Sequence, residues 1–312
     1  MNFTEKVQKY WTADRLKKLT TGHKYVILPT TGAELLRCLG ILNADASMSA
    51  DATRKYIQIN HLLAQFRPFL EDLNQRHKTI RILDAGCGSS FLTFLLAWAY
   101  RDLWKHPSLI IGIDASKSLI EKNVKNAAIL NLSDQVKFNV SPIAGFDWQG
   151  ELTKHSSETF EDAKAARPQA VVALHACDTA TDDAIAMGIK LKSDFIAVAP
   201  CCQAELARLW KGFAEANLTH PFSPAFSNPH LRREIAAQIT DLMRVLILRS
   251  QGYEVTTTEF TMSHATPKNT LILAVRRGNY HAESLQEYKN LVASLNGAEI
   301  SLATKVSMVP QR

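Results

Sequence analysis

The sequence contains no apolar run long enough to cross a membrane. Its richest apolar stretch, residues 91–100, is followed at once by Arg101 and Asp102, whereas a membrane-spanning helix needs about 20 apolar residues. Residues 1–18 mix acids and bases and lack the apolar core of a secretory signal. These absences predict a cytoplasmic protein without a membrane partner.

Cysteine is scarce, and its spacing excludes two common uses. The chain has 5 cysteines, an odd number, which does not suit the framework of a secreted disulfide protein. Zinc ligands are typically separated by about two to four residues, but Cys201 and Cys202 are adjacent. Only one residue separates His175 from Cys177. We therefore expect no metal site and a structural role for the adjacent cysteines, with a thiol that attacks the substrate as the alternative.

The composition is that of an ordinary folded protein with a basic surface. Hydrophobic residues make up 46% of the chain and charged residues 21%, which is enough to build a sizeable core. The formal net charge is +6. This charge makes a polyanion such as RNA a candidate partner, although a generally basic soluble protein would carry it as well.

The clearest pattern is a strand, a glycine turn and a helix within residues 80–104. A short apolar, β-prone run ends at Asp84, and the turn that follows contains Gly86 and Gly88. Gly86 lets the backbone approach a ligand where a Cβ would collide, and the amides at the start of the helix can bind an anionic group. The pattern predicts a ligand-binding turn.

Two enzyme families use such a turn. Dinucleotide enzymes hold a pyrophosphate there and continue to a third glycine, where this chain has Ser90. Class I methyltransferases hold the methionine end of S-adenosylmethionine (SAM) and have an acid ahead of the turn, as Asp84 is here. We therefore predict that Asp84, Gly86, Cys87 and Gly88 bind SAM, and a dehydrogenase stays as an alternative.

Strands and helices alternate after this turn. Strands are predicted at residues 108–114, 135–140, 170–178 and 194–203, with helices between them. This alternation predicts a doubly wound, mostly parallel sheet. Two further strands, 254–262 and 269–277, are joined by a short loop and should add an antiparallel hairpin at the C-terminal end, giving seven strands in all.

Polar residues stand where the predicted strands end, which is the ligand-binding edge of such sheets. Asp114 ends the second strand, and its two oxygens can accept hydrogen bonds from both ribose hydroxyls of a nucleoside. Ser141 follows the third strand, near the expected adenine. His175 and Asp178 come at the end of the fourth strand. We predict that Asp114, Ser141 and His175 contact the cofactor.

The rest of the chain is expected to support this domain. Residues 1–50 are predicted to form a helical extension, residues 51–280 the main domain, and residues 281–312 a helix and a tail. Residues 145–168 look like connecting material with a short helix around residues 158–166. The Pro-rich segment 219–229 looks like a loop long enough to cover a site.

Three arginines are predicted to bind the substrate. Arg54 lies on a long helix that Asp51 is expected to cap, and Arg232 and Arg233 follow the Pro-rich segment. A solvated helix face is the alternative for Arg54.

The segments LHACDTATD and APCCQAEL, together with LDAGCGSSFLTF and RKYIQIN, resemble one group of class I methyltransferase domains. This group includes a tRNA ribose 2′-O-methyltransferase and glutathione-S-transferase-C-terminal-domain-containing proteins. The resemblance covers residues 50–277, and its firmest marks are His175, Cys177, Thr181, Asp182, Cys201 and Cys202. It implies a Rossmann-like fold, SAM as cofactor and RNA as a candidate acceptor. The chain departs from the tRNA enzymes in having Asp178 in place of a glycine and no zinc-finger array in residues 1–50.

Methyl transfer needs an aligned acceptor and, for a hydroxyl, a group that removes a proton. His175 or Asp178 could take that role, with packing of the histidine and helix capping by the aspartate as the alternatives. No N/D-PP-Y/F motif follows the fourth strand, which disfavours methylation of an exocyclic or amide nitrogen. The acceptor is predicted to be RNA, with a small molecule or a protein as alternatives. A non-catalytic SAM-binding module is the alternative from another class, and the sequence leaves the oligomeric state undetermined.

Overall fold

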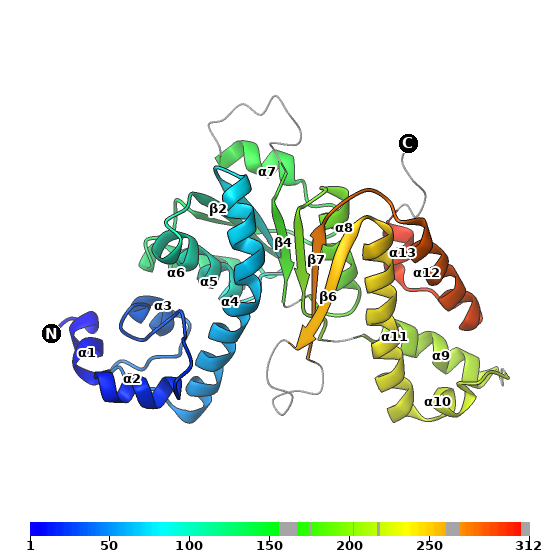
Figure 1. The fold of residues 1–312 in the computed structure, drawn as a ribbon, viewed down its shortest axis with the longest axis horizontal. Helices are drawn as coiled ribbons and strands as arrows, with labels where there is room; N and C mark the ends of the chain where they lie inside the picture. The colour runs from blue at the N-terminus through cyan, green and yellow to red at the C-terminus, as the bar shows by residue number, and fades with distance from the viewer. Residues whose placement is uncertain (156–166, 175, 202, 217–218, 260–268, 307–312) are drawn as a thin grey trace.

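The computed structural model describes most of the chain (Figure 1). The described residues are 1–155, 167–174, 176–201, 203–216, 219–259 and 269–306. His175 and Cys202, both singled out in the sequence, lie outside these ranges. Within the ranges, no helix is long and apolar enough to span a membrane.

Seven strands form one sheet in the order β3-β2-β1-β4-β5-β7-β6. They are β1 (Ile80–Ala85), β2 (Ser108–Asp114), β3 (Val136–Val140), β4 (Ala170–Ala173), β5 (Phe195–Val198), β6 (Tyr253–Glu259) and β7 (Thr270–Arg276). β1 to β5 run parallel, whereas β7 is antiparallel to both β5 and β6. The predicted doubly wound, mostly parallel sheet with a C-terminal antiparallel hairpin is confirmed.

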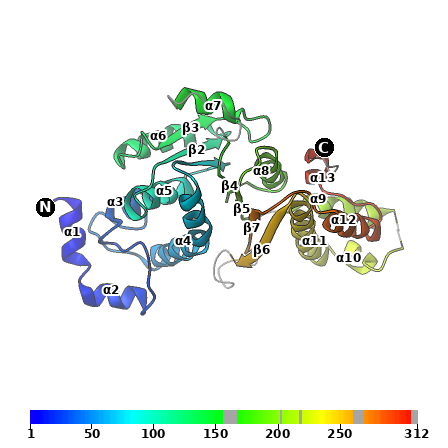
Figure 2. The same ribbon diagram turned by 45° about the horizontal axis from the view of Figure 1, so that its top comes forward.

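Helices cover both faces of the sheet. They are α1 (Phe3–Tyr10), α2 (Ala13–Thr20), α3 (Ala33–Cys38), α4 (Ala50–Arg76), α5 (Phe91–Trp98), the π-helix η1 (Ala99–Leu103), α6 (Lys117–Ile129), α7 (Trp148–His155), α8 (Thr179–Lys190), α9 (Glu205–Glu215), α10 (Ser223–Ser227), α11 (Pro229–Ser250), α12 (Ala282–Ser294) and α13 (Ser301–Lys305). Figure 2 shows α4 and α5 on one face, with α8 and α11 on the other.

Successive residues of the strands supply two separate cores. Ile82 of β1 packs with side chains of α4 and α5, whereas its neighbour Leu83 packs with side chains of α8 and α11. Adjacent residues of a strand point to opposite faces, so a strand buried on both faces is apolar throughout. This is why β4 and β5 are visible in the sequence as continuous apolar runs.

The N-terminal helices are fastened to α4. The indole Nε1 of Trp11 donates a hydrogen bond to the carbonyl of Ala46 (2.9 Å), and the Tyr56 hydroxyl on α4 donates to the carbonyl of Ile27 (2.7 Å). Residues from α1, α3 and α4 share one apolar core. We keep residues 1–50, 51–280 and 281–312 as a proposed division of the chain.

The long helix before β1 begins earlier than predicted. Its N-terminal cap is Ser49, whose Oγ accepts a hydrogen bond from the amide of Ala52 (3.1 Å), and not Asp51. Asp51 lies within the first turn and pairs with Arg54. The helix also continues through Pro68 to Arg76.

Two segments predicted to connect the main elements contain helices that the sequence did not indicate. The short helix predicted around residues 158–166 lies outside the described residues. Residues 145–168 include α7, in which Trp148 is almost fully buried and anchors the helix to the core. Residues 219–229 include α10, in which Phe226 is buried with its ring centroid 4.9 Å from that of Trp210. In both cases one large aromatic side chain packs the helix against the protein, whereas the polar residues around it gave no helical pattern in the sequence.

Candidate active site

The glycine turn after β1 is bonded to the end of β2. The amides of Gly86 and Cys87 both donate to the carbonyl of Ile113, at 2.9 and 2.8 Å. Gly86 has φ +74° and Gly88 has φ +54°, in the left-handed region that glycine adopts at little cost. Ser90 shares this conformation, with φ +59°, just before α5 begins. The turn is therefore held in a fixed shape against two neighbouring strands.

Asp114 lies beside this turn, where β2 ends. Its Oδ2 accepts a hydrogen bond from the amide of Gly88 (2.9 Å), and its Oδ1 accepts one from the amide of Ser116 (2.8 Å). Each carboxylate oxygen has two lone pairs, so each can accept one more hydrogen bond. The carboxylate is thus oriented by the backbone and still has capacity for two hydroxyl donors.

Asp84 lies beneath the turn and is only 2% exposed. Its Oδ2 accepts a hydrogen bond from the hydroxyl of Thr93 on α5 (2.5 Å). Burial raises the pKa of Asp84 to about 7, and the bond from Thr93 opposes part of that rise. Asp84 therefore joins the end of β1 to the start of α5 from inside the protein.

Cys87, between the two glycines, is also buried. Burial raises the pKa of its thiol well above the ordinary value, so the thiolate is disfavoured. A Cβ on Gly112 would lie only 3.2 Å from the Cys87 sulfur, which shows how closely this side chain packs on β2. These features suit a packing residue rather than a nucleophile.

The end of β3 reaches the same place. The amide of Ser141 donates to the carbonyl of Asp114 (3.0 Å), while its hydroxyl donates to the carbonyl of Pro142 (2.8 Å). The side chain of Ile143 lies 3.5 Å from where a Gly86 Cβ would stand. The structure thus brings the predicted residues of the first three strands together.

Asn123 completes this group, although nothing in the sequence marked it. It is fully buried on α6, and its Nδ2 donates to the carbonyl of Gly88 (2.8 Å). A single asparagine in an amphipathic helix carries no motif, so only its position against the turn identifies it. It holds the carbonyl of the second glycine from α6.

Asp178 follows β4 in an unusual backbone conformation, with φ 52° and ψ −118°. Its Oδ1 accepts hydrogen bonds from the amides of Ala204 (2.9 Å) and Glu205 (3.3 Å), and its Oδ2 pairs with Arg208 (3.0 Å). Burial acts to raise the pKa of Asp178, but the bonds from Ala204 and Arg208 outweigh it and hold that pKa below its ordinary value. The carboxylate is ionised and is a weak base.

A buried ionic network lies behind the ends of β4 and β5. Arg244 of α11, which is 1% exposed, donates to Asp182 (2.7 Å) and to Asp241 (3.0 Å). Its Nη2 also donates to the carbonyl of Asp178 (3.1 Å). Gln203, after β5, donates to the second oxygen of Asp241 (2.9 Å). The network joins both strand-end loops to α8 and α11.

β4 and β5 end earlier than predicted, at Ala173 and Val198. The last bond between them runs from the amide of Ala199 to the carbonyl of Ala173 (3.0 Å). Cys177 and Cys201 therefore lie in loops. Cys177 is exposed and Cys201 is only partly buried, and the structural role of Cys201 and Cys202 stays a prediction.

The three arginines predicted to bind substrate lie at the beginnings of two helices. Arg54 is exposed and pairs with Asp51 at the start of α4. Arg232 is half-buried and donates to the carbonyl of Phe226 (2.5 Å), and Arg233 is exposed. In Figure 1 the beginnings of α4 and α11 lie on opposite sides of the lower edge of the sheet, where the parallel strands end.

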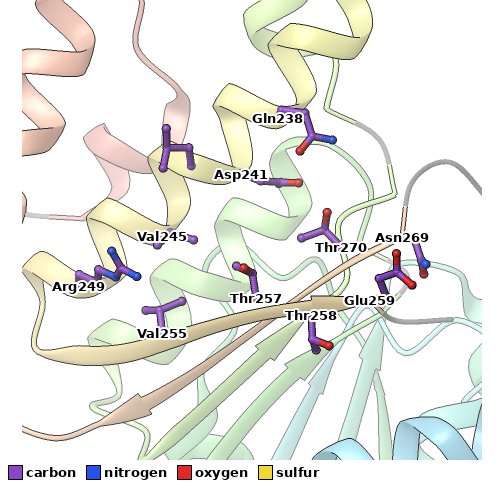
Figure 3. A pocket seen from close by; sticks show the side chains of 11 residues that line it. Gln238, Asp241, Val245, Arg249, Val255, Thr257, Thr258, Glu259, Asn269 and Thr270 are labelled. Carbon is purple, nitrogen blue, oxygen red and sulfur yellow. The ribbon is translucent and has the colours of Figure 1, made fainter. Parts of the chain in front are cut away.

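A groove of about 600 Å³ lies apart from the turn, between α11 and β6 (Figure 3). Gln238, Asp241 and Arg249 line it from α11, and Thr257 and Glu259 line it from β6. None of its lining residues belongs to the turn or to the end of β2. Asp241 connects it to the buried network.

One family model matches the central part of the chain. Residues 54–209 match the model of a family described as a methyltransferase domain. A search of curated proteins gives no match.

Similar solved structures include a SAH-bound methyltransferase from Podospora anserina, at 13% identity and a TM-score of 0.42 over 85% of this chain and 95% of that one. An O-methyltransferase from Bacillus cereus with SAH shows 16% identity and a TM-score of 0.43 over 86% and 99%. An rRNA methylase described for Clostridium thermocellum shows 15% identity and a TM-score of 0.36 over 64% and 88%. Because the family model spans half of the sequence, the chain belongs to the methyltransferase domain family and is a SAM-dependent enzyme.

Proposed function

We propose that SAM lies over the glycine turn, with its methionine end at Gly86 and Gly88 and its ribose on Asp114. The observation that carries this proposal is the carboxylate of Asp114, which two backbone amides orient and which keeps one lone pair on each oxygen. Two adjacent ribose hydroxyls supply the matching pair of donors. The left-handed glycines leave the turn without side chains where the amino-acid part would rest.

The other residues of this group support the turn from different sides. Asp84 acts from beneath through Thr93, and Asn123 acts through the carbonyl of Gly88. Ser141 is bonded to the backbone of Asp114, so the segment after β3 would border the adenine. Cys87 contributes packing. SAM supplies an activated methyl group, and these residues fix where that group points.

The acceptor would approach from the loops after β4 and β5, since the ends of β1 to β3 are occupied by the cofactor. Asp178 belongs to the first of these loops, but its charge is already bound to the start of α9 and to Arg208. We therefore propose that Asp178 positions the loop. The base stays a prediction for His175, which lies outside the described residues.

Asp178→Asn should lower the free energy of unfolding by about 1 kcal/mol and leave methyl transfer measurable. The asparagine oxygen can still accept from Ala204 and Glu205, but the ion pair with Arg208 is lost. Urea unfolding and single-turnover transfer would be measured on the same sample. Complete loss of transfer with an unchanged unfolding curve would instead identify Asp178 as the base.

We propose RNA as the acceptor, on the basis of basic residues on both sides of the strand ends. Residues 1–50 contain seven lysines and arginines against four acids. On the other side, the side chains of Arg208 and Lys211 on α9 are 62% and 64% exposed, and Arg233 is exposed at the start of α11. Arg54 would contribute from the start of α4. A polyanion lying along this edge could contact both groups.

Replacing Arg232 and Arg233 together by alanine should weaken RNA binding and flatten its salt dependence, by about 0.7 in slope for each lost contact to a single strand. SAM affinity should not change, because neither residue contacts the turn. Arg277→Ala is the matched control. Arg277 is 61% exposed but follows β7, which ends where the parallel strands begin, so it lies away from the ends of the parallel strands. Equal salt dependence in the double variant and the native protein would remove these arginines from the interface.

The acceptor class itself is tested by transfer of a labelled methyl group from SAM. The purified protein is incubated with separate RNA, protein and small-molecule fractions, and the label in each is counted. Label in RNA alone supports the proposal. A small-molecule acceptor is the second candidate, because the groove between α11 and β6 has a volume suited to such a ligand. Label confined to the small-molecule fraction would establish that candidate and refute RNA.

A further inference from the structure

Two thiols from neighbouring strands meet beyond the ends of β4 and β5. The Sγ atoms of Cys177 and Cys201 are 3.0 Å apart. The parallel register aligns Ala173 with Val198, so the cysteines lie four and three residues past paired positions. A disulfide bond measures about 2.05 Å between its sulfur atoms. The bond would therefore form after the two sulfur atoms approach each other by about 1 Å.

The two loops are already held together near these thiols. The amide of Ala180 donates to the carbonyl of Cys177 (3.1 Å), which fixes the first loop at the start of α8. Asp178, the residue after Cys177, accepts a hydrogen bond from the amide of Ala204, which lies three residues after Cys201. This bond keeps the second thiol beside the first, so their effective concentration is high.

The thiols are also reachable from solvent. Cys177 is exposed and Cys201 is partly exposed, whereas Cys87 is buried in the turn. Cys38 is partly buried on α3, in the N-terminal part of the chain. Cys177 and Cys201 are therefore both close to each other and accessible to solvent. Because the reactivity of a cysteine depends on its accessibility, they are the thiols expected to react.

We propose that Cys177 and Cys201 form a reversible disulfide by exchange with a small disulfide such as oxidised glutathione. The thiolate of Cys177 attacks one glutathione sulfur, the glutathione S–S bond breaks, and one glutathione leaves as its thiolate. The thiolate of Cys201 then attacks the sulfur of Cys177 and displaces the second glutathione. The protein loses two electrons and two protons, and the glutathione disulfide takes up both.

The disulfide should slow methyl transfer more than it weakens SAM binding, a consequence that rests on the proposed function. The joined loops border the space assigned to the acceptor, and the crosslink would restrict their opening. The turn and Asp114 belong to neither loop, but Ala176 of the first loop lies 3.6 Å from where a Gly86 Cβ would stand, so SAM affinity should change less than the transfer rate.

The test is to equilibrate the full chain with mixtures of reduced and oxidised glutathione, quench with an alkylating reagent, and map the peptides by mass spectrometry. The expected result is loss of two thiols, assigned to Cys177 and Cys201 and reversed by dithiothreitol. Melting temperature should rise in the oxidised form, because the crosslink restricts the unfolded chain. Intact thiols at the most oxidising ratio, or a bond assigned to another pair, would overturn the proposal.

Single variants test the order of the two steps. Cys201→Ser should accumulate glutathione on Cys177, because the second thiol that releases it is missing. Cys202→Ser should form the same disulfide as the native protein, and a requirement for Cys202 would contradict the assignment.

Calorimetry with SAM on oxidised and reduced protein separates the two proposals. Failure to bind SAM in both forms counts against the proposed cofactor site and does not affect the disulfide proposal. Equal rates of methyl transfer in the oxidised and reduced forms would refute the proposal that the disulfide slows transfer.

Discussion

Replacing Arg244 with methionine should lower the free energy of unfolding by about 3–5 kcal/mol, because one buried side chain neutralises two buried acids. Asp182 is fully buried and Asp241 is 7% exposed, and both accept hydrogen bonds from this guanidinium. Methionine fills similar space but leaves both carboxyl groups without their cation. Urea unfolding at neutral pH, followed by far-UV circular dichroism, measures the change.

Arg208→Met is the matched control for this prediction. Arg208 also pairs with an aspartate, Asp178, but its side chain is 62% exposed. Exposed ion pairs contribute about 1 kcal/mol or less, so this variant should unfold close to the native protein. A second comparison adds Asp182→Asn to Arg244→Met and should recover part of the lost stability. Similar small effects for Arg244 and Arg208 would show that the buried network does not hold the strand-end loops.

Replacing Asp114 with alanine should weaken SAM binding by about 1.5–3 kcal/mol, or roughly 10- to 150-fold in Kd. The variant loses the acceptor for both ribose hydroxyls, and it also frees the amides of Gly88 and Ser116. Isothermal titration calorimetry gives the affinity. Thermal unfolding of the same preparation shows whether the turn itself has been lost.

Asp134→Ala serves as the control for Asp114. It removes one exposed acid just before β3, at the N-terminal ends of the parallel strands and thus at the end of the sheet away from the proposed site. Its SAM affinity should equal that of the native protein. An unchanged Kd in Asp114→Ala would exclude the carboxylate from the cofactor site.

The fold was predictable because its signals are local. β4 and β5 are buried on both faces and so form unbroken apolar runs, and the turn at Gly86 and Gly88 marks where the first strand ends. The ends of β4 and β5 were harder to predict. The apolar pattern continues past Ala173 into Leu174 and past Val198 into Ala199, so hydrophobicity alone does not mark where the chain leaves the sheet; only Pro200 argues against a longer β5.

The supporting residues of the site were not predictable, because each acts through a partner distant in the sequence. Asn123 meets Gly88 across 35 positions, and Arg244 meets Asp182 across 62. Neither residue belongs to a motif, and an arginine in an amphipathic helix is more often solvated. Their roles follow only from the packing of α6 and α11 against the strand ends.

The central claim is that the cofactor occupies the turn after β1 and the end of β2. Hydrogen–deuterium exchange of the native protein, with and without saturating S-adenosylhomocysteine, tests it most directly. The expected result is slower exchange in peptides covering residues 86–90 and 114–116, with little change in residues 238–259 beside the groove. Protection confined to residues 238–259, with unchanged exchange at 86–90, would contradict the claim.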